Sequence, residues 1–143
     1  MPRRGNRVGI GKGLVFGTAG IPHSSKSPTT QAGIVRIHDL GLGCMEVEFV
    51  QGVRMSENSA LPIGETASKR GIRLTAHAPY YINLNSQEEE KIVASRHRII
   101  QTARVTSAFG GEGIVVHAAF YMKRPPEEVY DKVKRHLTEI IEQ

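Results

Sequence analysis

An alternation of apolar runs and helical stretches, repeated four times, is the feature that most constrains how this chain folds. Short, mainly apolar runs are typical of strands buried in a parallel sheet. Strands that alternate with helices predict such a sheet, with right-handed crossover connections. We expect strands at residues 14–18, 44–49, 72–77 and 113–117.

Local signals place the ends of the first two helices. The first is expected to begin near Thr29 or Thr30 and to stop at Gly41. The second is expected near residues 60–70, with Gly71 as its left-handed cap.

The third and fourth helices have clearer starts. Ser86, followed three residues later by Glu89, predicts a capping box, and the helix should then continue to about Ala108. In the last helix, residues 125–128 place prolines in the first turn and acidic residues at the positive end of the helix dipole. An apolar stripe with helical spacing follows, made of Val129, Val133, Leu137, Ile140 and Ile141.

The number of units sets the architecture. A closed (β/α)8 barrel needs eight strands and typically about 250 residues, and a flavodoxin-like sheet normally needs about five units. Four strand–helix units in 143 residues therefore predict half of a (β/α)8 TIM barrel, a single truncated domain over residues 1–143. Residues 1–13 are expected to be a basic N-terminal extension. The first and fourth strands would be open edges, so we expect a homo-oligomer or pairing with a missing C-terminal half.

Composition narrows the class of protein. The net charge of +5 permits a polyanionic partner without requiring one. Cys44 is the only cysteine, which excludes an internal disulfide and a cysteine-built zinc site. No apolar run approaches the roughly 20 residues that span a bilayer, and none follows the basic start as in a signal peptide. We expect a cytoplasmic protein with no membrane partner.

His77 and His117 stand at the ends of the third and fourth predicted strands. In barrels of alternating strands and helices, the chemistry lies where strands end and loops begin. Two imidazoles at that level of neighbouring strands could share one metal ion, although a catalytic zinc site usually takes three protein ligands. We interpret the pair as metal ligands; either histidine alone would be better explained as a buried, hydrogen-bonded residue.

Other ionisable residues are weaker candidates for the same site. His23 follows the first strand and could join the pair, or could be an ordinary loop histidine. Glu46 and Glu48 share one face of a strand, where carboxylates are costly unless paired or bound to metal. The histidines on predicted helices are interpreted as surface residues, namely His38, His97 and His136.

The loops at this end of the predicted sheet carry groups suited to a nucleic acid. Tyr80, Tyr81 and Asn83 follow His77, and could stack on a base or sugar and bind a phosphate, or could pack the loop. Basic residues from three different loops would suit a phosphate backbone that crosses the mouth of the barrel. They are Lys26, Arg54, Lys123 and Arg124.

A family resemblance is carried by three segments, at residues 16–22, 41–49 and 77–84, and by Ser95 and Arg96 on the third predicted helix. There the sequence resembles the endonuclease IV family of the xylose-isomerase-like barrel superfamily, and its archaeal members most. The resemblance extends from Leu14 onward, but over only the first half of the family's barrel, so it implies that these four strand–helix units form the N-terminal half of a (β/α)8 TIM barrel. It implies an eightfold barrel with three zinc ions that cleaves DNA on the 5′ side of abasic sites.

By that resemblance, His77 and His117 are similar to two histidines that hold one zinc ion. Arg54 falls where the family inserts an arginine into DNA, and Tyr80 and Asn83 match a tyrosine and an asparagine of a DNA-contacting loop. The family's other metal ligands come from strand five onward and have no counterpart here. We therefore expect little or no incision of abasic-site DNA by this chain alone.

Two other functions are compatible with the sequence. One is a truncated sugar isomerase or epimerase of the same superfamily. The other is a non-catalytic half-barrel that binds DNA or a protein partner without cutting, which the missing carboxylates would favour.

Overall fold

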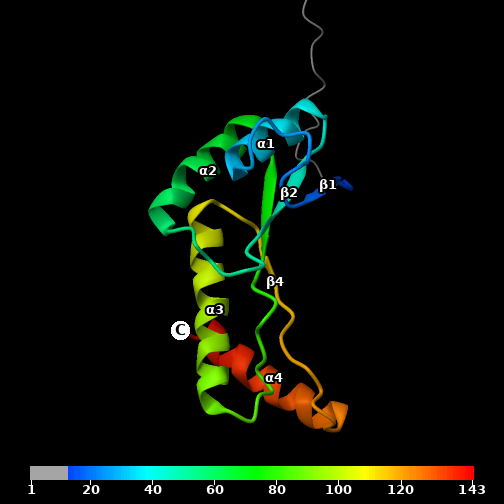
Figure 1. Cartoon of the computed structure of the whole chain (residues 1–143), viewed down its shortest axis with the longest axis vertical. Coiled ribbons are helices and arrows are strands. Elements are labelled where there is room, and N and C mark those ends of the chain that lie inside the picture. Colours follow the sequence, from blue (N-terminus) through cyan, green and yellow to red (C-terminus); the bar gives the residue numbers. More distant parts are fainter. Residues whose placement is uncertain (1–12) are drawn as a thin grey trace, which may run out of the picture.

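The computed structural model describes residues 13–143, so the expected basic extension, Gly13 apart, lies outside the described residues. Within this range, four parallel strands form one sheet whose order follows the chain, β1-β2-β3-β4. Each strand is followed by a helix, as the sequence predicted (Figure 1). The elements are β1 (Gly17–Ala19), α1 (Thr30–Asp39), β2 (Cys44–Glu48), α2 (Glu57–Arg70), β3 (Arg73–His77), α3 (Glu89–Ala108), β4 (Ile114–Val115) and α4 (Pro126–Ile141).

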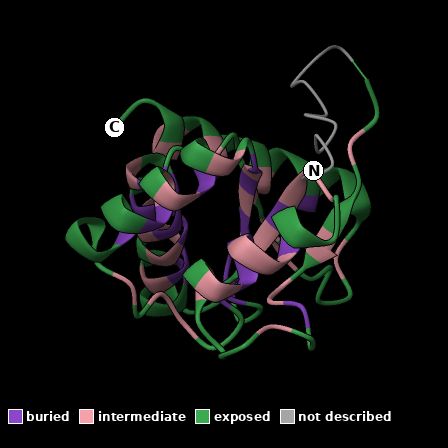
Figure 2. Cartoon of the chain, turned by 90° about the horizontal axis from the view of Figure 1, so that it is seen from above, coloured by how far each residue is buried: buried purple, intermediate pink, exposed green. Residues whose placement is uncertain are grey.

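The two central strands separate an apolar face from a polar one. Alternate residues of β2 and β3 are buried, because successive side chains of a strand point to opposite faces. The buried set packs under the helices, and Figure 2 shows buried residues concentrated where helices and strands face each other. The opposite face lines a hollow of about 470 Å³, and we call it the concave face. It carries polar and ionisable side chains. They are Glu46, Glu48, Arg73, Thr75 and His77.

Two apolar clusters hold the chain together. The first cluster joins α1, α2 and the end of α3 to the sheet, and includes Ile34, Met45 and Leu74. The second cluster is smaller and lies beyond the sheet, where Ile82, Leu84 and Ile99 meet the apolar side of α4. Ile114 packs against both, so β4 marks the boundary between them.

The first two helices end largely as predicted. Thr29 caps α1, its hydroxyl accepting a hydrogen bond from the Ala32 amide. Gly71 ends α2 with φ of 66°, a left-handed conformation that glycine adopts without strain. The predicted start of α2 was three residues late. Ser56 and Ser59 form a reciprocal capping box before Pro62, so the helix begins at Glu57 despite a proline inside it.

Both edge strands are shorter than predicted. β1 begins at Gly17, and most of the apolar run before it is exposed, Leu14 by 82%. A Cβ on Gly17 would lie 1.8 Å from the Cys44 carbonyl oxygen, so only glycine lets β1 approach β2 there. β4 is two residues long, and its last residue, Val115, pairs with His77. On the facing segment Pro79 follows, and its ring holds φ near −65°, away from the roughly −120° of a parallel strand.

Three local predictions for α3 and α4 were wrong. Ser86 does not cap through Glu89; its hydroxyl accepts from the Glu88 amide, and α3 has no side-chain cap. Ile141 leaves the apolar stripe of α4 and is 82% exposed. His136 is buried rather than a surface residue, with 7% of its area exposed.

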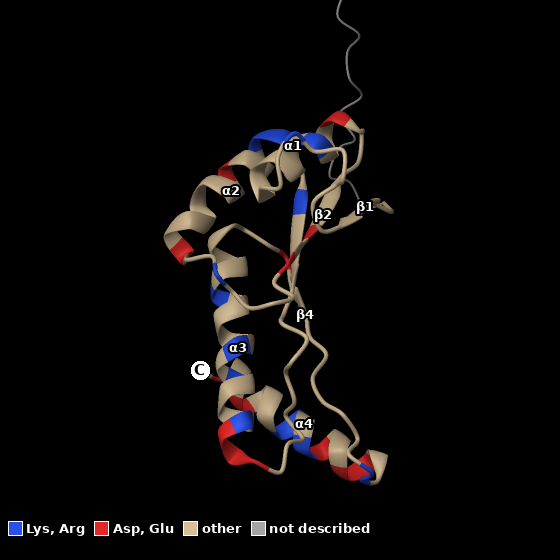
Figure 3. Ribbon diagram, viewed as in Figure 1, with Lys and Arg blue, Asp and Glu red and all other residues tan. Residues whose placement is uncertain are grey.

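Every helix among residues 13–143 is too short or too polar to cross a membrane. Charged residues instead mark the helix ends: acidic side chains gather at the starts of α3 and α4, where they face the positive end of each helix dipole (Figure 3).

Candidate metal site and its rim

His77 and His117 bring their imidazoles together at the carboxyl end of the sheet. Their Nε2 atoms lie 3.1 Å apart, and the ring centroids are separated by 5.0 Å. His77 is the last residue of β3, whereas His117 follows the end of β4 by two residues. The two side chains therefore meet although one belongs to a strand and the other to a loop.

The hydrogen bonds of the two histidines determine which ring nitrogens are available to bind a metal ion. The Nδ1 atom of His77 lies 2.7 Å from the Ala78 carbonyl oxygen, to which its N–H donates. Such a bond fixes the tautomer and leaves Nε2 as a lone-pair donor, as in metal-ligating histidines. Within the pair, His117 then donates its Nε2 proton to His77.

This donor set fits a metal ion shared by the two rings. Two nitrogens bound to zinc at about 2.0–2.1 Å in tetrahedral geometry stand roughly 3.3 Å apart, close to the observed separation of 3.1 Å. Among the described residues, no group of three or more His, Cys, Asp or Glu side chains is placed to hold a metal. The pair therefore offers part of a ligand set, and its role as a metal site stays a prediction.

The weaker candidate ligands do not complete a metal-binding set with the histidine pair. Glu48 is paired in register with His77 across the sheet, and Glu46 with Thr75, so both carboxylates belong to the concave face. His23 is exposed in the loop after β1. The structure places none of these three in a multi-ligand cluster with the histidine pair.

Tyr80 and Tyr81 form an aromatic step in the loop that follows His77. Their rings meet edge to face, with centroids 5.2 Å apart, and Tyr80 is 61% exposed. The guanidinium of Arg98, on α3, lies 4.5 Å from the centre of the Tyr81 ring and anchors it. Tyr81 is thus held in place by its neighbours, and Tyr80 presents most of its surface to solvent.

Asn83 has a different environment from the one its sequence position suggested. Its side-chain oxygen accepts hydrogen bonds from the amides of Asn85 and Phe120. Its own backbone N–H donates to the hydroxyl of Ser95 on α3, at 2.9 Å. These bonds occupy the Asn83 side-chain oxygen within the protein and leave its amide NH2 group as the part that could reach a ligand.

The four basic residues predicted for the site lie in the loops after β1, β2 and β4. Arg54 is exposed in the loop after β2 and lines a hollow of about 440 Å³ with Glu48 and Phe49. Lys26 is exposed after β1, and Lys123 is exposed and Arg124 half-buried after β4. Loops that follow parallel strands leave the sheet at the same end as His77, and we call these four residues the basic rim; their common role stays a prediction.

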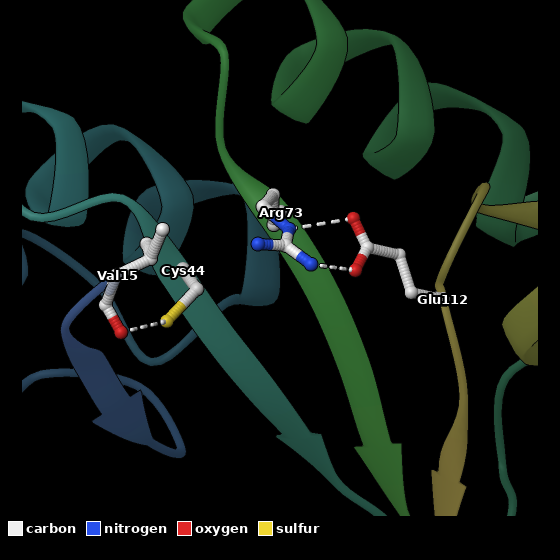
Figure 4. A network of polar contacts seen from close by, with 4 residues as sticks. All are labelled: Val15, Cys44, Arg73 and Glu112. Atoms are coloured by element: carbon white, nitrogen blue, oxygen red, sulfur yellow. Dashed lines mark hydrogen bonds and ion pairs between the residues drawn. The ribbon is translucent and has the colours of Figure 1, made fainter. Parts of the chain in front are cut away.

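An ion pair on the concave face was missed by the sequence reading. Arg73 begins β3 and forms two parallel hydrogen bonds to the Glu112 carboxylate, one of them 2.7 Å long from Nε (Figure 4). The hydrogen bond from Arg73 lowers the pKa of Glu112, and the same bond raises the pKa of Arg73. The pair lies at the opposite end of β3 from His77. Near it, the Cys44 sulfur is 3.9 Å from the Val15 carbonyl.

Buried Asn85 was also missed, and Ser95 was noted only for the family resemblance, because the roles of both depend on carbonyl and amide groups that are remote in sequence. A serine inside a helix is a weak signal. Ser95 donates to the Lys91 carbonyl one turn back, which is ordinary for serine in a helix.

With this geometry in view, comparison with known proteins identifies the fold. Residues 34–143 match the model of the family described as xylose isomerase-like TIM barrel. The chain belongs to this family. The four strands and four helices are accordingly the N-terminal half of a TIM barrel, as the count of units and the family resemblance together predicted.

An uncharacterized protein of Methanocaldococcus jannaschii shares 42% identity with this xylose isomerase-like chain over 129 residues, which are 90% of the chain and 45% of the relative. The chain thus spans about half the length of the curated relative that it matches.

Solved structures extend the fold similarity. D-psicose 3-epimerase from Clostridium cellulolyticum, crystallised with D-tagatose, is 12% identical with a TM-score of 0.66, over 87% of this chain and 47% of that one. Endonuclease IV from Thermus thermophilus is 18% identical with a TM-score of 0.58, over 85% and 46%. At these identities the similarity establishes the shared barrel.

Proposed function

We propose that this chain is the N-terminal portion of an endonuclease IV-like, zinc-dependent phosphodiesterase that cleaves DNA on the 5′ side of abasic sites. The observation that carries the proposal is the His77–His117 pair. Two Nε2 atoms 3.1 Å apart, one with its tautomer fixed by a carbonyl, form a donor set suited to zinc. The pair lies at the end of the sheet where barrel enzymes carry out their chemistry.

Bound zinc would supply an activated water and would stabilise charge on the phosphate. The residues of this chain would hold it and orient the DNA. Arg54, Lys26 and Lys123 are exposed in three loops that leave this end of the sheet, and they would neutralise phosphates that cross the barrel mouth. The exposed Tyr80 ring offers a surface on which a base or deoxyribose beside the lesion would stack.

The remaining parts of such a site would come from a second half-barrel. The histidine pair alone is short of the three ligands that a catalytic zinc usually takes. A complementary half, covalently joined or separate, would add ligands and would pair with the edges that β1 and β4 present. We expect this half chain to bind zinc and DNA weakly and to incise abasic-site DNA little or not at all.

A second candidate function is the isomerisation or epimerisation of a sugar. Its support is the polar concave face, where Glu46 and Thr75 lie side by side in register and could hydrogen-bond to hydroxyl groups. A third candidate is a half-barrel that binds DNA or a partner without catalysis. The exposed tyrosine and the basic rim favour nucleic acid over a sugar.

Zinc titration and DNA-binding assays test the proposal together. Zinc affinity, measured by competition with a chromophoric chelator, should fall at least tenfold in His77→Ala and in His117→Ala. His38→Ala, which removes an exposed histidine of α1, is the matched control and should retain wild-type affinity.

Fluorescence anisotropy should then show tighter binding to a duplex with one abasic site than to an intact duplex, and Tyr80→Ala should reduce that preference. Equal affinity for both duplexes, together with zinc binding that survives loss of both histidines, would refute the nuclease assignment. Metal-dependent interconversion of ketoses, followed by NMR, would support the sugar alternative instead.

A further inference from the structure

The position of His117 is not set by the sheet. β4 ends at Val115, and the ladder's last recorded bond runs from the Ala78 amide to the Val115 carbonyl, at 2.9 Å. The next bond of a parallel ladder would run from the His117 amide to the Ala78 carbonyl, but that carbonyl accepts the N–H of the His77 ring, and Pro79 then turns the backbone away from strand geometry. His117 therefore lies in a loop segment, and some other contact must keep its ring 3.1 Å from His77.

The contacts that hold this segment come from the loop between β3 and α3. The Leu84 amide donates to the Ala118 carbonyl, next to His117, at 2.9 Å. The side chain of Asn85 donates to two successive carbonyls of the same segment, those of Phe120 at 2.8 Å and Tyr121 at 3.2 Å. Asn83 completes the clamp by accepting from the Phe120 amide.

Two properties of Asn85 indicate that the hydrogen bonds donated by its side-chain NH2 group explain why an asparagine occupies this position. It is fully buried, and its side-chain oxygen has no hydrogen-bond partner among the described residues. A buried acceptor without a partner is costly, so an apolar residue would suit this position better if packing alone mattered. The asparagine is explained by the two carbonyls that it holds.

The clamped carbonyls precede a strained turn. Met122 and Lys123 have φ values of 53° and 61°, a left-handed region that non-glycine residues rarely adopt. Such conformations persist only where surrounding contacts determine them. The Asn85 bonds to Phe120 and Tyr121 act at the entrance to this turn, between His117 and the basic residues of the rim.

We propose that Asn85 is a positioning residue: by holding the Phe120 and Tyr121 carbonyls, it fixes the loop after β4 and thereby sets the His117 imidazole against His77. It acts through the loop and touches neither ring. The metal part of the inference rests on the function proposed above, whereas the placement of the two rings does not.

The experiment uses the whole chain with two readouts, zinc affinity and the metal-free contact between the rings. Zinc affinity is measured by chelator competition, and the contact by the nuclear Overhauser effect between protons of the two imidazoles. Asn85→Ala removes both bonds and should weaken zinc binding about 10- to 100-fold, the range typical when a supporting group of a metal ligand is lost. The inter-ring Overhauser effect should disappear as well.

Two further variants make the result specific. Asn85→Ser keeps one short donor and should fall between the wild type and Asn85→Ala in both readouts. It also preserves the test if the alanine variant fails to fold. Asn58→Ala removes an exposed asparagine at the start of α2 and should change neither readout.

The outcomes separate the two proposals. If the wild type binds no zinc but its ring contact is present and is lost in the Asn85 variants, the metal assignment fails and the positioning role stands. If folded Asn85→Ala or Asn85→Ser retains both wild-type zinc affinity and the inter-ring contact, the positioning role is overturned.

Discussion

The two apolar clusters of this chain are built by different means. The first cluster is a sheet covered by helices, with side chains such as Ile34 and Leu74 interdigitated under α1 and α2. The second cluster has fewer buried apolar side chains and relies on polar links such as the Asn85 amide and the ion pair between Arg96 and Glu139. Because apolar packing supplies most of the free energy of folding, the first cluster should be the more stable of the two. The candidate site lies at their boundary.

The largest expected effect on stability comes from a substitution in the first cluster. Leu74→Ala should lower the free energy of unfolding by about 2–5 kcal/mol, because it leaves a cavity between the sheet and the helices. Urea denaturation followed by circular dichroism measures the change. Leu61→Ala, at an exposed position of α2, is the control and should have little effect.

A substitution in the second cluster should act locally. Ile82→Ala removes a fully buried side chain there, and should raise amide hydrogen exchange in residues 78–86 and in α4 more than in β2. A uniform increase across both clusters would show that they unfold as one unit, and the distinction between them would fail.

A smaller, pH-dependent effect is expected from His136. Burial lowers its pKa, with the Glu139 charge opposing, and neither ring nitrogen has a hydrogen-bond partner among the described residues. Since the unfolded chain then binds the proton more readily, stability is full above about pH 6.5 and falls as pH drops toward the lowered folded value. Thermal unfolding from about pH 7.5 to about pH 5 should show this loss in the wild type.

The matched variant for that measurement is His136→Leu, which should flatten the pH dependence in the same interval. His38→Leu, at an exposed position, should retain the wild-type slope. Equal slopes in the wild type and His136→Leu would exclude His136 as the source.

The smallest effect is expected at the exposed Arg73–Glu112 pair of the concave face. The pKa of Glu112 is lowered by the Arg73 hydrogen bond, so the pair stabilises the fold above about pH 4.5 and loses that contribution as pH falls through the lowered value. Because both groups are well solvated, Glu112→Gln should change the unfolding midpoint only slightly near neutral pH. A large shift in the unfolding midpoint would mean that the concave face contributes as much to stability as a buried apolar cluster.

The sequence could predict features that depend on neighbouring residues, but not features that depend on a partner strand or helix. Strand–helix alternation and glycine caps such as Gly71 depend on neighbours in sequence, and these indicated the half-barrel and most helix ends. The shortness of β4 depends on its partner segment, where Pro79 follows β3, and the burial of His136 depends on how α4 packs. Such features require the partner strand or helix to be known.

The candidate site was predictable to the same extent. The meeting of His77 and His117 followed from their places near the ends of adjacent parallel strands. Asn83 was expected to contact DNA from its loop position and from the family resemblance, and this stays a prediction; its side-chain oxygen accepts hydrogen bonds from within the protein, which the sequence did not indicate. Asn85 carried no signal, because its partners are backbone carbonyls, which every residue has.

The proline that follows the β3–β4 ladder has a thermodynamic consequence. Because strand pairing stops before Pro79, His77 moves with the sheet and His117 with the loop that the second cluster supports. A ligand gripped by both rings would cross-link the two clusters, and by mass action its binding free energy would add to the cost of separating them. Occupancy of the histidine pair and rigidity of the loop after β4 would then rise and fall together.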